Sequence, residues 1–141
     1  MSLSELGTRL EAIKVAMATR YPARVVTRDL KGFAEHKDAD LKKGIYSLVS
    51  IGEGKFKVAP RISMGWGKHG MLLVGQIRLD EKTKPNPSDV EEAELLMRDE
   101  VKAFLENLPL DLATLTCTDW RQSAQSEHPD GWISFDLEFK P

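Results

Sequence analysis

The stretch GWISFDLEFK, residues 131–140, constrains the fold more than any other part of the chain. Apolar and polar side chains alternate strictly along it. In a β-strand, this period of two places the apolar side chains on one face and the polar ones on the other. The apolar set is Ile133, Phe135, Leu137 and Phe139, and the polar set is Ser134, Asp136, Glu138 and Lys140. The sequence therefore predicts a sheet with one wet face and one face that other elements cover.

A first amphipathic helix is predicted near the start of the chain. Its apolar residues recur every three or four positions from Leu3 to Met17 and form one stripe. Ser2 and Glu5 have the spacing of a capping box, in which a hydroxyl and a carboxylate satisfy free backbone N–H groups. Pro22 disfavours helical backbone at the residue before it, so we expect the helix to end there.

A second amphipathic helix is predicted from Ser88 to Leu108. Ser88 and Glu91 have capping-box spacing, and Pro109 follows the last apolar position. The apolar face comprises Val90, Ala93, Met97, Val101, Phe104 and Leu108. Acidic residues crowd the first turns, where the helix dipole favours negative charge. We expect these acids, namely Asp89, Glu91, Glu92 and Glu94, to complement the dipole and form a solvated face.

The remaining patterns predict strands at residues 23–29, 44–54, 69–81, 113–122 and 131–140. The predicted order is αβββαββ. The fold class that follows is α+β, a two-layer sandwich with two helices on one face of a mixed, mainly antiparallel sheet of about five strands. The chain, residues 1–141, is expected to be a single domain, because this is a common domain size.

Two regions of this scheme lack regular patterning. The segment Leu30–Gly44 mixes both signs of charge without a period, so we expect a long, flexible loop. In strand 69–81, Met71, Leu73, Ile77 and Leu79 share one face, and Leu72 and Val74 lie on the other. Gln76 and Arg78 follow on that second face, so we expect its polar end to be exposed to solvent.

Composition limits the classes of function and location. The net charge is -2, so bulk charge does not favour nucleic acid, and any DNA contact would be local. The single cysteine, Cys117, excludes an intramolecular disulfide and fits a reducing compartment. We expect no signal peptide, because Glu5, Arg9 and Glu11 interrupt the N-terminal apolar residues. The apolar run GMLLVG is too short to span a bilayer, so a cytoplasmic protein is expected.

Residues that often carry catalysis do not converge in the sequence. His36, Asp38 and Asp40 could offer ligands to a metal, but their spacing matches no calcium loop. The pattern places Cys117 on an apolar face, where a cysteine usually acts as a small hydrophobe. The three histidines, His36, His69 and His128, fall in predicted loops or at strand edges. We therefore expect no enzymatic activity, metal or cofactor.

The stretch KFKVAPRISMGWGKHG, residues 55–70, is basic in an acidic protein. Its cations are Lys55, Lys57, Arg61 and Lys68, with Phe56 and Trp66 between them. Such a mixture can grip single-stranded nucleic acid through phosphate contacts and stacking. We favour a connection between two strands whose charges keep a sheet edge soluble. A protein partner is the intermediate hypothesis, since Trp and Arg are frequent binding anchors.

Two long stretches resemble the phage tail terminator family. In WGKHGMLLVGQIRLDEKTKPNPSDVEEAELLMRDEVKAFLENLP, a Trp precedes an apolar strand, and a loop with Pro and Ser opens an acidic helix. In DWRQSAQSEHPDGWISFDLEFKP, an aromatic-Arg strand, an acidic turn with Gly and an alternating last strand follow one another. The first helix and the loop at residues 30–44 are also in register with the family's plan, so the likeness covers nearly the whole chain.

The resemblance implies a structural role in phage or prophage assembly. Members of the family form a hexameric ring that docks on the end of the tail tube, stops its polymerisation and presents a surface to the head connector. The implied partners are the chain itself, the tail-tube protein and the head connector or completion protein, with no organic cofactor. We expect no membrane contact, and we rank contact of the basic stretch with DNA passing through the ring below contact with protein. The implied location is the host cytoplasm during assembly and then the virion tail.

We expect partner contacts from the loop and from the basic stretch. In the loop, Phe33 is the expected anchor, with His36 and Lys37 beside it. Phe33 could equally pack on the subunit's own core. In the basic stretch the expected contacts are Lys55, Lys57, Arg61, Trp66 and Lys68. The matching region of the lambda member of the family leans acidic, so the resemblance does not identify what this stretch touches. Another head–tail joining or minor tail protein remains an alternative.

Overall fold

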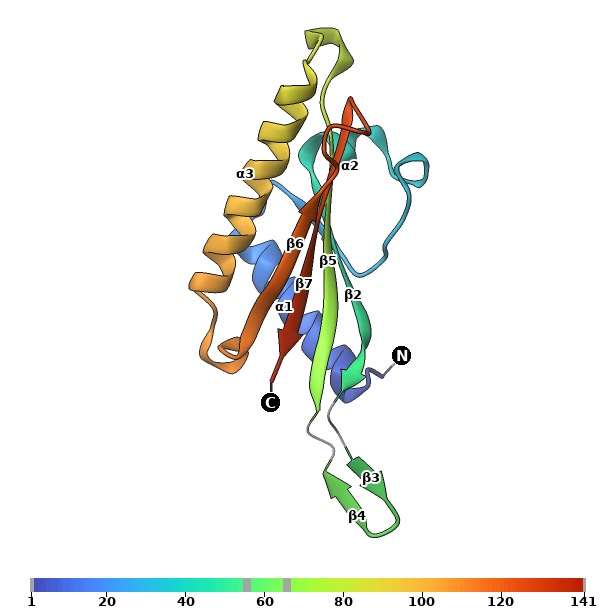
Figure 1. Cartoon of the computed structure of the whole chain (residues 1–141), viewed down its shortest axis with the longest axis vertical. Coiled ribbons are helices and arrows are strands. Elements are labelled where there is room, and N and C mark those ends of the chain that lie inside the picture. Colours follow the sequence, from blue (N-terminus) through green and yellow to red (C-terminus); the bar gives the residue numbers. More distant parts are fainter. Residues whose placement is uncertain (1, 55–56, 65–66, 141) are drawn as a thin grey trace.

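A mixed five-stranded sheet with two long helices on one face forms the body of the molecule (Figure 1). The computed structural model describes residues 2–54, 57–64 and 67–140. The strands lie in the order β1-β2-β5-β7-β6, and only the β1–β2 pair in this sheet is parallel within the described ranges. They are β1 (Val25–Thr27), β2 (Ile45–Gly54), β5 (Lys68–Arg78), β7 (Asp130–Phe139) and β6 (Leu115–Gln122). The predicted fold class, an α+β sandwich, is confirmed.

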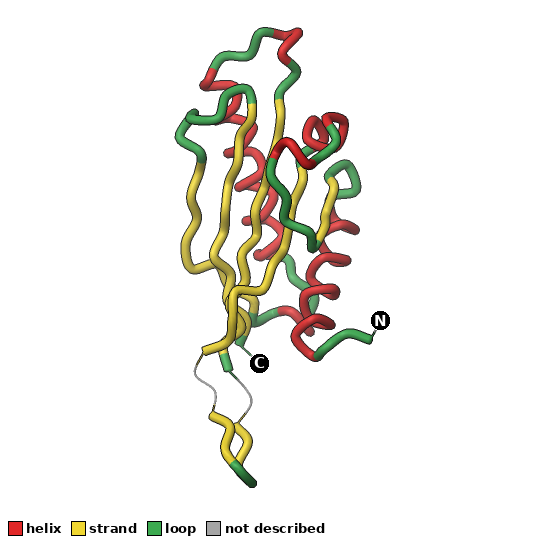
Figure 2. Tube along the Cα trace, turned by 90° about the vertical axis from the view of Figure 1, so that its right-hand side faces the viewer, coloured by secondary structure: helices red, strands yellow, loops and turns green. Residues whose placement is uncertain are grey.

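The helices α1 (Glu5–Arg20) and α3 (Pro87–Glu106) cover what we call the inner face of the sheet, and Figure 2 shows the layers from the side. The predicted alternation in β7 is confirmed, because its four apolar side chains are buried beneath the helices. From the helices, Leu10, Ile13, Met17, Met97, Val101 and Phe104 join the same core. No helix in the described part of the chain is long and apolar enough to cross a membrane.

The connection from β1 to β2 crosses the opposite, outer face. Two parallel neighbouring strands need a crossover connection, because the chain returns to the same end of the sheet before it pairs again. Since α1 and α3 occupy the inner face, this crossover runs over the outer one. We call it the strap, residues 28–44. The loop predicted for Leu30–Gly44 is wrong in secondary structure, because the strap holds the 3-10 turn η1 (Phe33–Glu35) and the helix α2 (Asp38–Lys43). Its flexibility stays a prediction.

The structure contains a second feature, besides α2, that the predicted element order did not include. Between β2 and β5 the chain forms a small separate hairpin of β3 (Lys57–Ala59) and β4 (Ile62–Met64). We call β3, β4 and the turn between them the ribbon. It lies beyond the end of the main sheet in both views (Figures 1 and 2). A connection was predicted here, but its strand pairing was not.

Neither helix begins at the predicted capping box: α1 has a simple N-cap at Ser4, and the capping box of α3 is formed by Asn86 and Asp89. Helix α1 begins after Ser4, whose Oγ accepts a hydrogen bond from the Gly7 N–H at 3.0 Å. Helix α3 begins after Asn86, with a proline at its first position and the Asp89 carboxylate accepting from the Asn86 N–H at 2.7 Å. A proline at the first helical turn loses no hydrogen bond, because that N–H has no partner within the helix. This preference favours the start of α3 before Ser88.

Glu94 is buried, although it was predicted on a solvated helix face. It is 0% exposed and points from α3 to the end of the β6–β7 hairpin. Its carboxylate accepts hydrogen bonds from the Trp132 N–H at 2.9 Å and from the Ser123 hydroxyl. Gly131 makes this approach possible, because a Cβ there would lie 2.8 Å from Glu94 Oε2. Glu94 therefore fastens the hairpin to α3.

Replacing this buried acceptor is expected to destabilise the fold. Glu94→Ala leaves the Trp132 N–H and the Ser123 hydroxyl without their acceptor, so we expect a loss of about 2–4 kcal/mol in the free energy of unfolding. Urea titration followed by circular dichroism measures the loss. Glu92→Ala is the matched control on the exposed side of the same helix, with an expected change within about 0.5 kcal/mol. Equal effects of the two substitutions would contradict this role.

Candidate partner-binding surfaces

The predicted contact residues form two groups at opposite ends of the molecule. Figure 1 shows the strap, with α2, near one end of the sheet and the ribbon beyond the other. Phe33, His36 and Lys37 belong to the strap, whereas Lys57 and Arg61 belong to the ribbon and Lys68 begins β5. Lys55 and Trp66 lie outside the described residues. The structure therefore does not gather the predicted residues into one site.

Two of the three strap residues predicted to contact a partner, Phe33 and His36, are partly covered in the subunit itself. Phe33 is half-buried, and His36 lies with its Nε2 3.0 Å from Gln76 Oε1 on β5. Gln76 donates from its Nε2 to the Lys31 carbonyl at 2.9 Å and is only 5% exposed. The polar end of the outer face was predicted to be exposed, and this is wrong, because the strap covers it. Lys37, just before α2, is exposed.

The ribbon offers fewer described contacts. Arg61 lies in the turn between β3 and β4, has a φ of 64° and is exposed. At the base of the ribbon, the Lys68 ammonium lies 3.9 Å from a carboxylate oxygen of Glu138 on β7. Both side chains are half-buried, and at this distance the pair contributes little to stability. A function for the cationic ribbon in partner contact stays a prediction.

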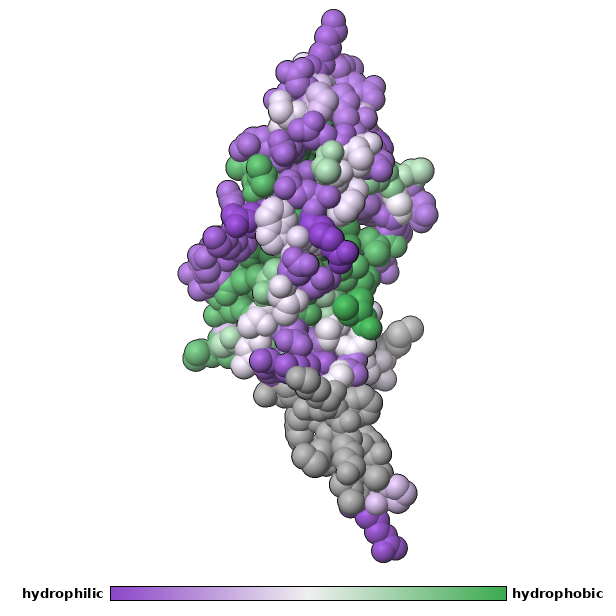
Figure 3. All heavy atoms as spheres, in the orientation of Figure 1, coloured by the Kyte–Doolittle hydropathy of each residue, from purple (hydrophilic) through white to green (hydrophobic). Residues whose placement is uncertain are grey.

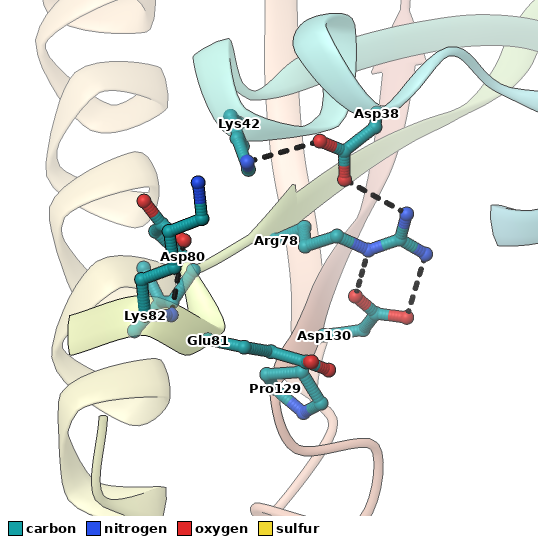
Figure 4. A pocket seen from close by; sticks show the side chains of 9 residues that line it. Asp38, Lys42, Arg78, Asp80, Glu81, Lys82, Pro129 and Asp130 are labelled. Carbon is teal, nitrogen blue, oxygen red and sulfur yellow. Dashed lines mark hydrogen bonds and ion pairs between the residues drawn. The ribbon is translucent and has the colours of Figure 1, made fainter. Parts of the chain in front are cut away.

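A hollow of ≈ 370 Å³ opens at the strap end, between α2, the end of β5 and the start of β7 (Figure 4). Its centre is Arg78, which donates to both Asp130 oxygens, at 2.7 and 3.2 Å, and to Asp38 at 3.2 Å. Asp38 also pairs with Lys42 at 3.0 Å. The lining residues are Asp38, Lys42, Arg78, Leu79, Asp80, Glu81, Lys82, Pro129 and Asp130. None of these was singled out as a site from the sequence, except Asp38 as a discounted metal ligand.

The charges in the hollow are matched to one another. Hydrogen bonds from Lys42 and then Arg78 lower the pKa of Asp38, and the bond from Arg78 to Asp130 raises the pKa of the guanidinium. Both groups are therefore charged near neutral pH. Because Arg78 already holds two carboxylates, its guanidinium is not free to bind an external anion. The hollow ties α2 to the sheet, and within the described residues no group of three or more His, Cys, Asp or Glu side chains could hold a metal ion.

A serine–histidine contact lies at the inner face, near the base of the ribbon. His69 was predicted at a loop or strand edge, yet it is 0% exposed within β5. Its Nε2 lies 2.8 Å from Ser50 Oγ, and its Nδ1 lies 3.4 Å from the guanidinium of Arg9. A guanidinium can only donate, so Nδ1 is the acceptor and Nε2 carries the proton. Nε2 therefore donates to Ser50 and cannot accept the serine proton, as nucleophilic catalysis would require.

Burial makes His69 a source of pH-dependent stability. Desolvation, followed by the charge of Arg9, lowers its pKa from 6.5, with Glu53 opposing. Below that value the unfolded chain binds a proton that the folded chain resists, so acidification favours unfolding. We expect the urea concentration at the midpoint of unfolding to be lower at about pH 5.5 than at about pH 7. This decrease should be smaller in His69→Gln. His128→Gln, at an exposed histidine, should keep the wild-type fall, and an unchanged fall in His69→Gln would refute the assignment.

Cys117 is exposed, contrary to the prediction of a buried small hydrophobe. It does lie toward the helices, in a groove of ≈ 180 Å³ between α3 and the outermost strand β6, beside Val101, Leu105 and Phe135. Desolvation raises the pKa of its thiol. Since the thiolate is the nucleophile, this environment does not activate Cys117. Cys117 still lies opposite the buried Leu137, so the alternation holds at this position, and its exposure goes with the place of β6 at the edge of the sheet.

Large apolar side chains stand exposed on both layers of the sandwich. A register break, between Ser50 and Gly52 of β2, places Ile51 over Gly70, and Ile51 is 60% exposed. On α1, Val15 is 54% exposed and lines a shallow groove of ≈ 470 Å³ with Leu3 and Pro109. Figure 3 shows hydrophobic groups on both sides of a mainly hydrophilic centre on the face it presents. Exposed apolar groups of this kind suit contacts with other proteins.

Comparison with known proteins adds no family to this geometry. No protein-family model matches the chain, and no curated protein matches it.

Proposed function

We propose that this chain is a structural protein of phage or prophage tail assembly, of the tail-terminator type. In this proposal it forms a ring on the finished tail tube, stops further polymerisation and provides the surface for head joining. The observation that carries the proposal is the exposure of apolar side chains on both layers, with Ile51 60% exposed on the sheet layer and Val15 54% exposed on the helix layer. The proposal includes no enzymatic reaction.

Exposed apolar groups on different surfaces favour a ring for a physical reason. Val15 lies on the side of α1 away from the residues buried against the sheet, Leu10, Ile13 and Met17. Ile51 belongs to the sheet layer. When one patch of a subunit meets a different patch of its neighbour, the contact is heterologous, and a rotation that closes produces a ring. We propose that the groove at Val15 of one subunit contacts the exposed Ile51 of its neighbour.

The remaining partners are proposed for the two ends of the molecule. A tail-tube end and a head connector are different surfaces, and the strap and the ribbon lie at opposite ends of the subunit (Figure 1). Phe33, His36 and Lys37 are proposed contacts at the strap end. Lys55, Lys57, Arg61, Trp66 and Lys68 are proposed contacts at the ribbon end. Within this proposal the protein acts in the host cytoplasm and then remains in the virion tail.

Another head–tail joining or minor tail protein is the second candidate function, because the same surfaces would serve it. A nucleic-acid module ranks below both. Its support is the basic run of the ribbon, but Lys68 already lies near Glu138 and the net charge of the chain is -2. Binding of single-stranded DNA that weakens steeply with salt would favour this third candidate. Immunogold labelling of one end of purified tails separates the first two.

The proposal predicts assembly beyond the monomer. Light scattering on a size-exclusion column should show an oligomer of about six subunits, alone or after addition of tail tubes. Ile51→Glu and Val15→Glu should each shift the mass toward the monomer, because each buries a charge in the proposed contact. Thr116→Glu, at an exposed position of β6, is the matched control and should assemble normally. Monomers at every concentration, with and without tail tubes, would reject the ring.

A further inference from the structure

The strap is attached to the outer face of the sheet through side chains. Within the described residues, the backbone hydrogen bonds of its middle part are local, such as Glu35 N–H to the Gly32 carbonyl and Leu41 N–H to the Lys37 carbonyl. The bonds to the sheet are those of Gln76 with His36 and Lys31 and that of Arg78 with Asp38. A segment without backbone pairing to its neighbour can detach without breaking the sheet ladder.

Both ends of the strap are fixed. At its start, the Arg28 guanidinium lies 3.6 Å from Glu11 and donates to the Gly7 carbonyl on α1. At its end, Arg24 donates to the Lys43 carbonyl at 2.8 Å, and Gly44 turns the chain into β2 with a φ of 87°. A Cβ on Gly44 would lie 2.5 Å from the Arg24 guanidinium, so this turn depends on glycine. A movement of the strap that keeps these contacts would therefore be confined to the segment between the two ends.

Opening the strap breaks few strong interactions. Arg78 keeps its two hydrogen bonds to Asp130 when Asp38 moves away, so its guanidinium is not left without a partner. The apolar loss comes from Leu41 of α2, which is 0% exposed when the strap is closed, and from Ile45 of β2, which is 1% exposed. Opposing this loss is Ser47 of β2, which is also 0% exposed and whose Oγ has no hydrogen-bond partner among the described residues. A buried hydroxyl without a partner carries a desolvation cost, and this cost is removed when water reaches it.

Ser47 belongs to the face that the strap covers. It follows Tyr46, whose hydroxyl lies 3.1 Å from the Met97 carbonyl of α3, so Tyr46 is on the inner face and Ser47 is on the outer face. Ile45, two residues earlier on the same side, is 1% exposed, and its partner in the register is Gln76. The strap covers this part of β2 and β5, so opening would bring water to Ser47.

We propose that the strap is a hinged cover that opens as one unit while the sheet and the two long helices stay folded. The open form exposes the outer face at Ile45, Ser47 and Gln76 and takes apart the hollow around Arg78. Leu41 holds the cover closed, and the unpartnered hydroxyl of Ser47 favours its opening. The inference concerns the isolated subunit and does not depend on the proposed function.

Native-state hydrogen exchange read by mass spectrometry tests the proposal on the full chain. The hydrogen-bonded amides of α2, such as those of Asp40 and Leu41, should exchange together and faster than those of β2, β5 and β7. Their exchange should also stay unchanged at low urea concentrations, which is the sign of an opening smaller than global unfolding. If these amides exchange at the rate of the central strands, the strap opens only when the protein unfolds and the proposal is wrong.

Two substitutions with opposite expected signs sharpen the test. Leu41→Ala should speed exchange of the strap by about tenfold or more relative to the central strands, because it removes the apolar anchor. Ser47→Ala should slow it by about fivefold, because the closed form no longer buries an unpartnered hydroxyl. Ser134→Ala is the matched control, since Ser134 lies in the same cross-strand row, opposite Val74, which is itself opposite Ser47. It should leave strap exchange unchanged.

The same two substitutions can also overturn the proposal. Faster strap exchange in Ser47→Ala would mean that the hydroxyl stabilises the closed form, and the proposal would be overturned. Unchanged exchange in Leu41→Ala would mean that α2 does not hold the cover, with the same consequence. Comparing strap peptides with central-strand peptides in the same sample separates local opening from a general loss of stability, so a destabilised variant still gives an answer.

Discussion

The parallel pairing of β1 with β2 is the constraint on which much of the structure depends. Val25 lies opposite Ile45, and Thr27 lies opposite Ser47, so the chain crosses a face of the sheet between these residues. The inner face is already occupied by α1 and α3, which leaves the outer face for the strap. The buried end of that face, the hollow around Arg78 and the cover over Ser47 all result from this one strand pair.

Two carboxylates of α3, the half-buried Glu100 and the buried Glu94, hold this helix to other parts of the fold in addition to the apolar core. Glu100 of α3 accepts from Arg24 at 3.0 and 2.8 Å and from the Tyr46 hydroxyl at 2.9 Å. Glu94, one and a half turns earlier, accepts from the β6–β7 hairpin. Removing one partner from such a group costs more than the bond itself contributes, because the other partner stays buried. These contacts fix which part of α3 faces which strand.

The outer surfaces carry weak ion pairs and exposed apolar side chains. The Asp38–Lys42 ion pair of the strap is exposed and the Lys68–Glu138 pair at the ribbon base spans 3.9 Å, so each contributes little to stability. Exposed Ile51 and Val15 contribute to protein contacts rather than to the core of this subunit in our proposal. In our proposals the inner layer stays folded while the strap opens, and the exposed outer side chains bind other proteins.

Much of the candidate surface could not be found from the sequence. The strap lacks a period because α2 has only six residues and a single buried apolar side chain, Leu41. Ile51 and Cys117 are exposed although the alternation holds at both, because Cys117 belongs to the edge strand β6 and Ile51 lies at the end of the outer face away from the strap. His69 and Glu94 are buried polar residues, and local sequence does not reveal the distant partners that make their burial possible.

The sequence by itself determined the two amphipathic helices, the alternating strand β7 and the two-layer class, because periodicity depends only on local geometry and on which side chains avoid water. Tertiary structure alone decided the strand order, the path of the strap and the burial of Gln76, Glu94 and His69. The physical reason is that each of these depends on groups far apart in the chain, such as His36 and Gln76, which only the folded sheet brings within hydrogen-bonding distance.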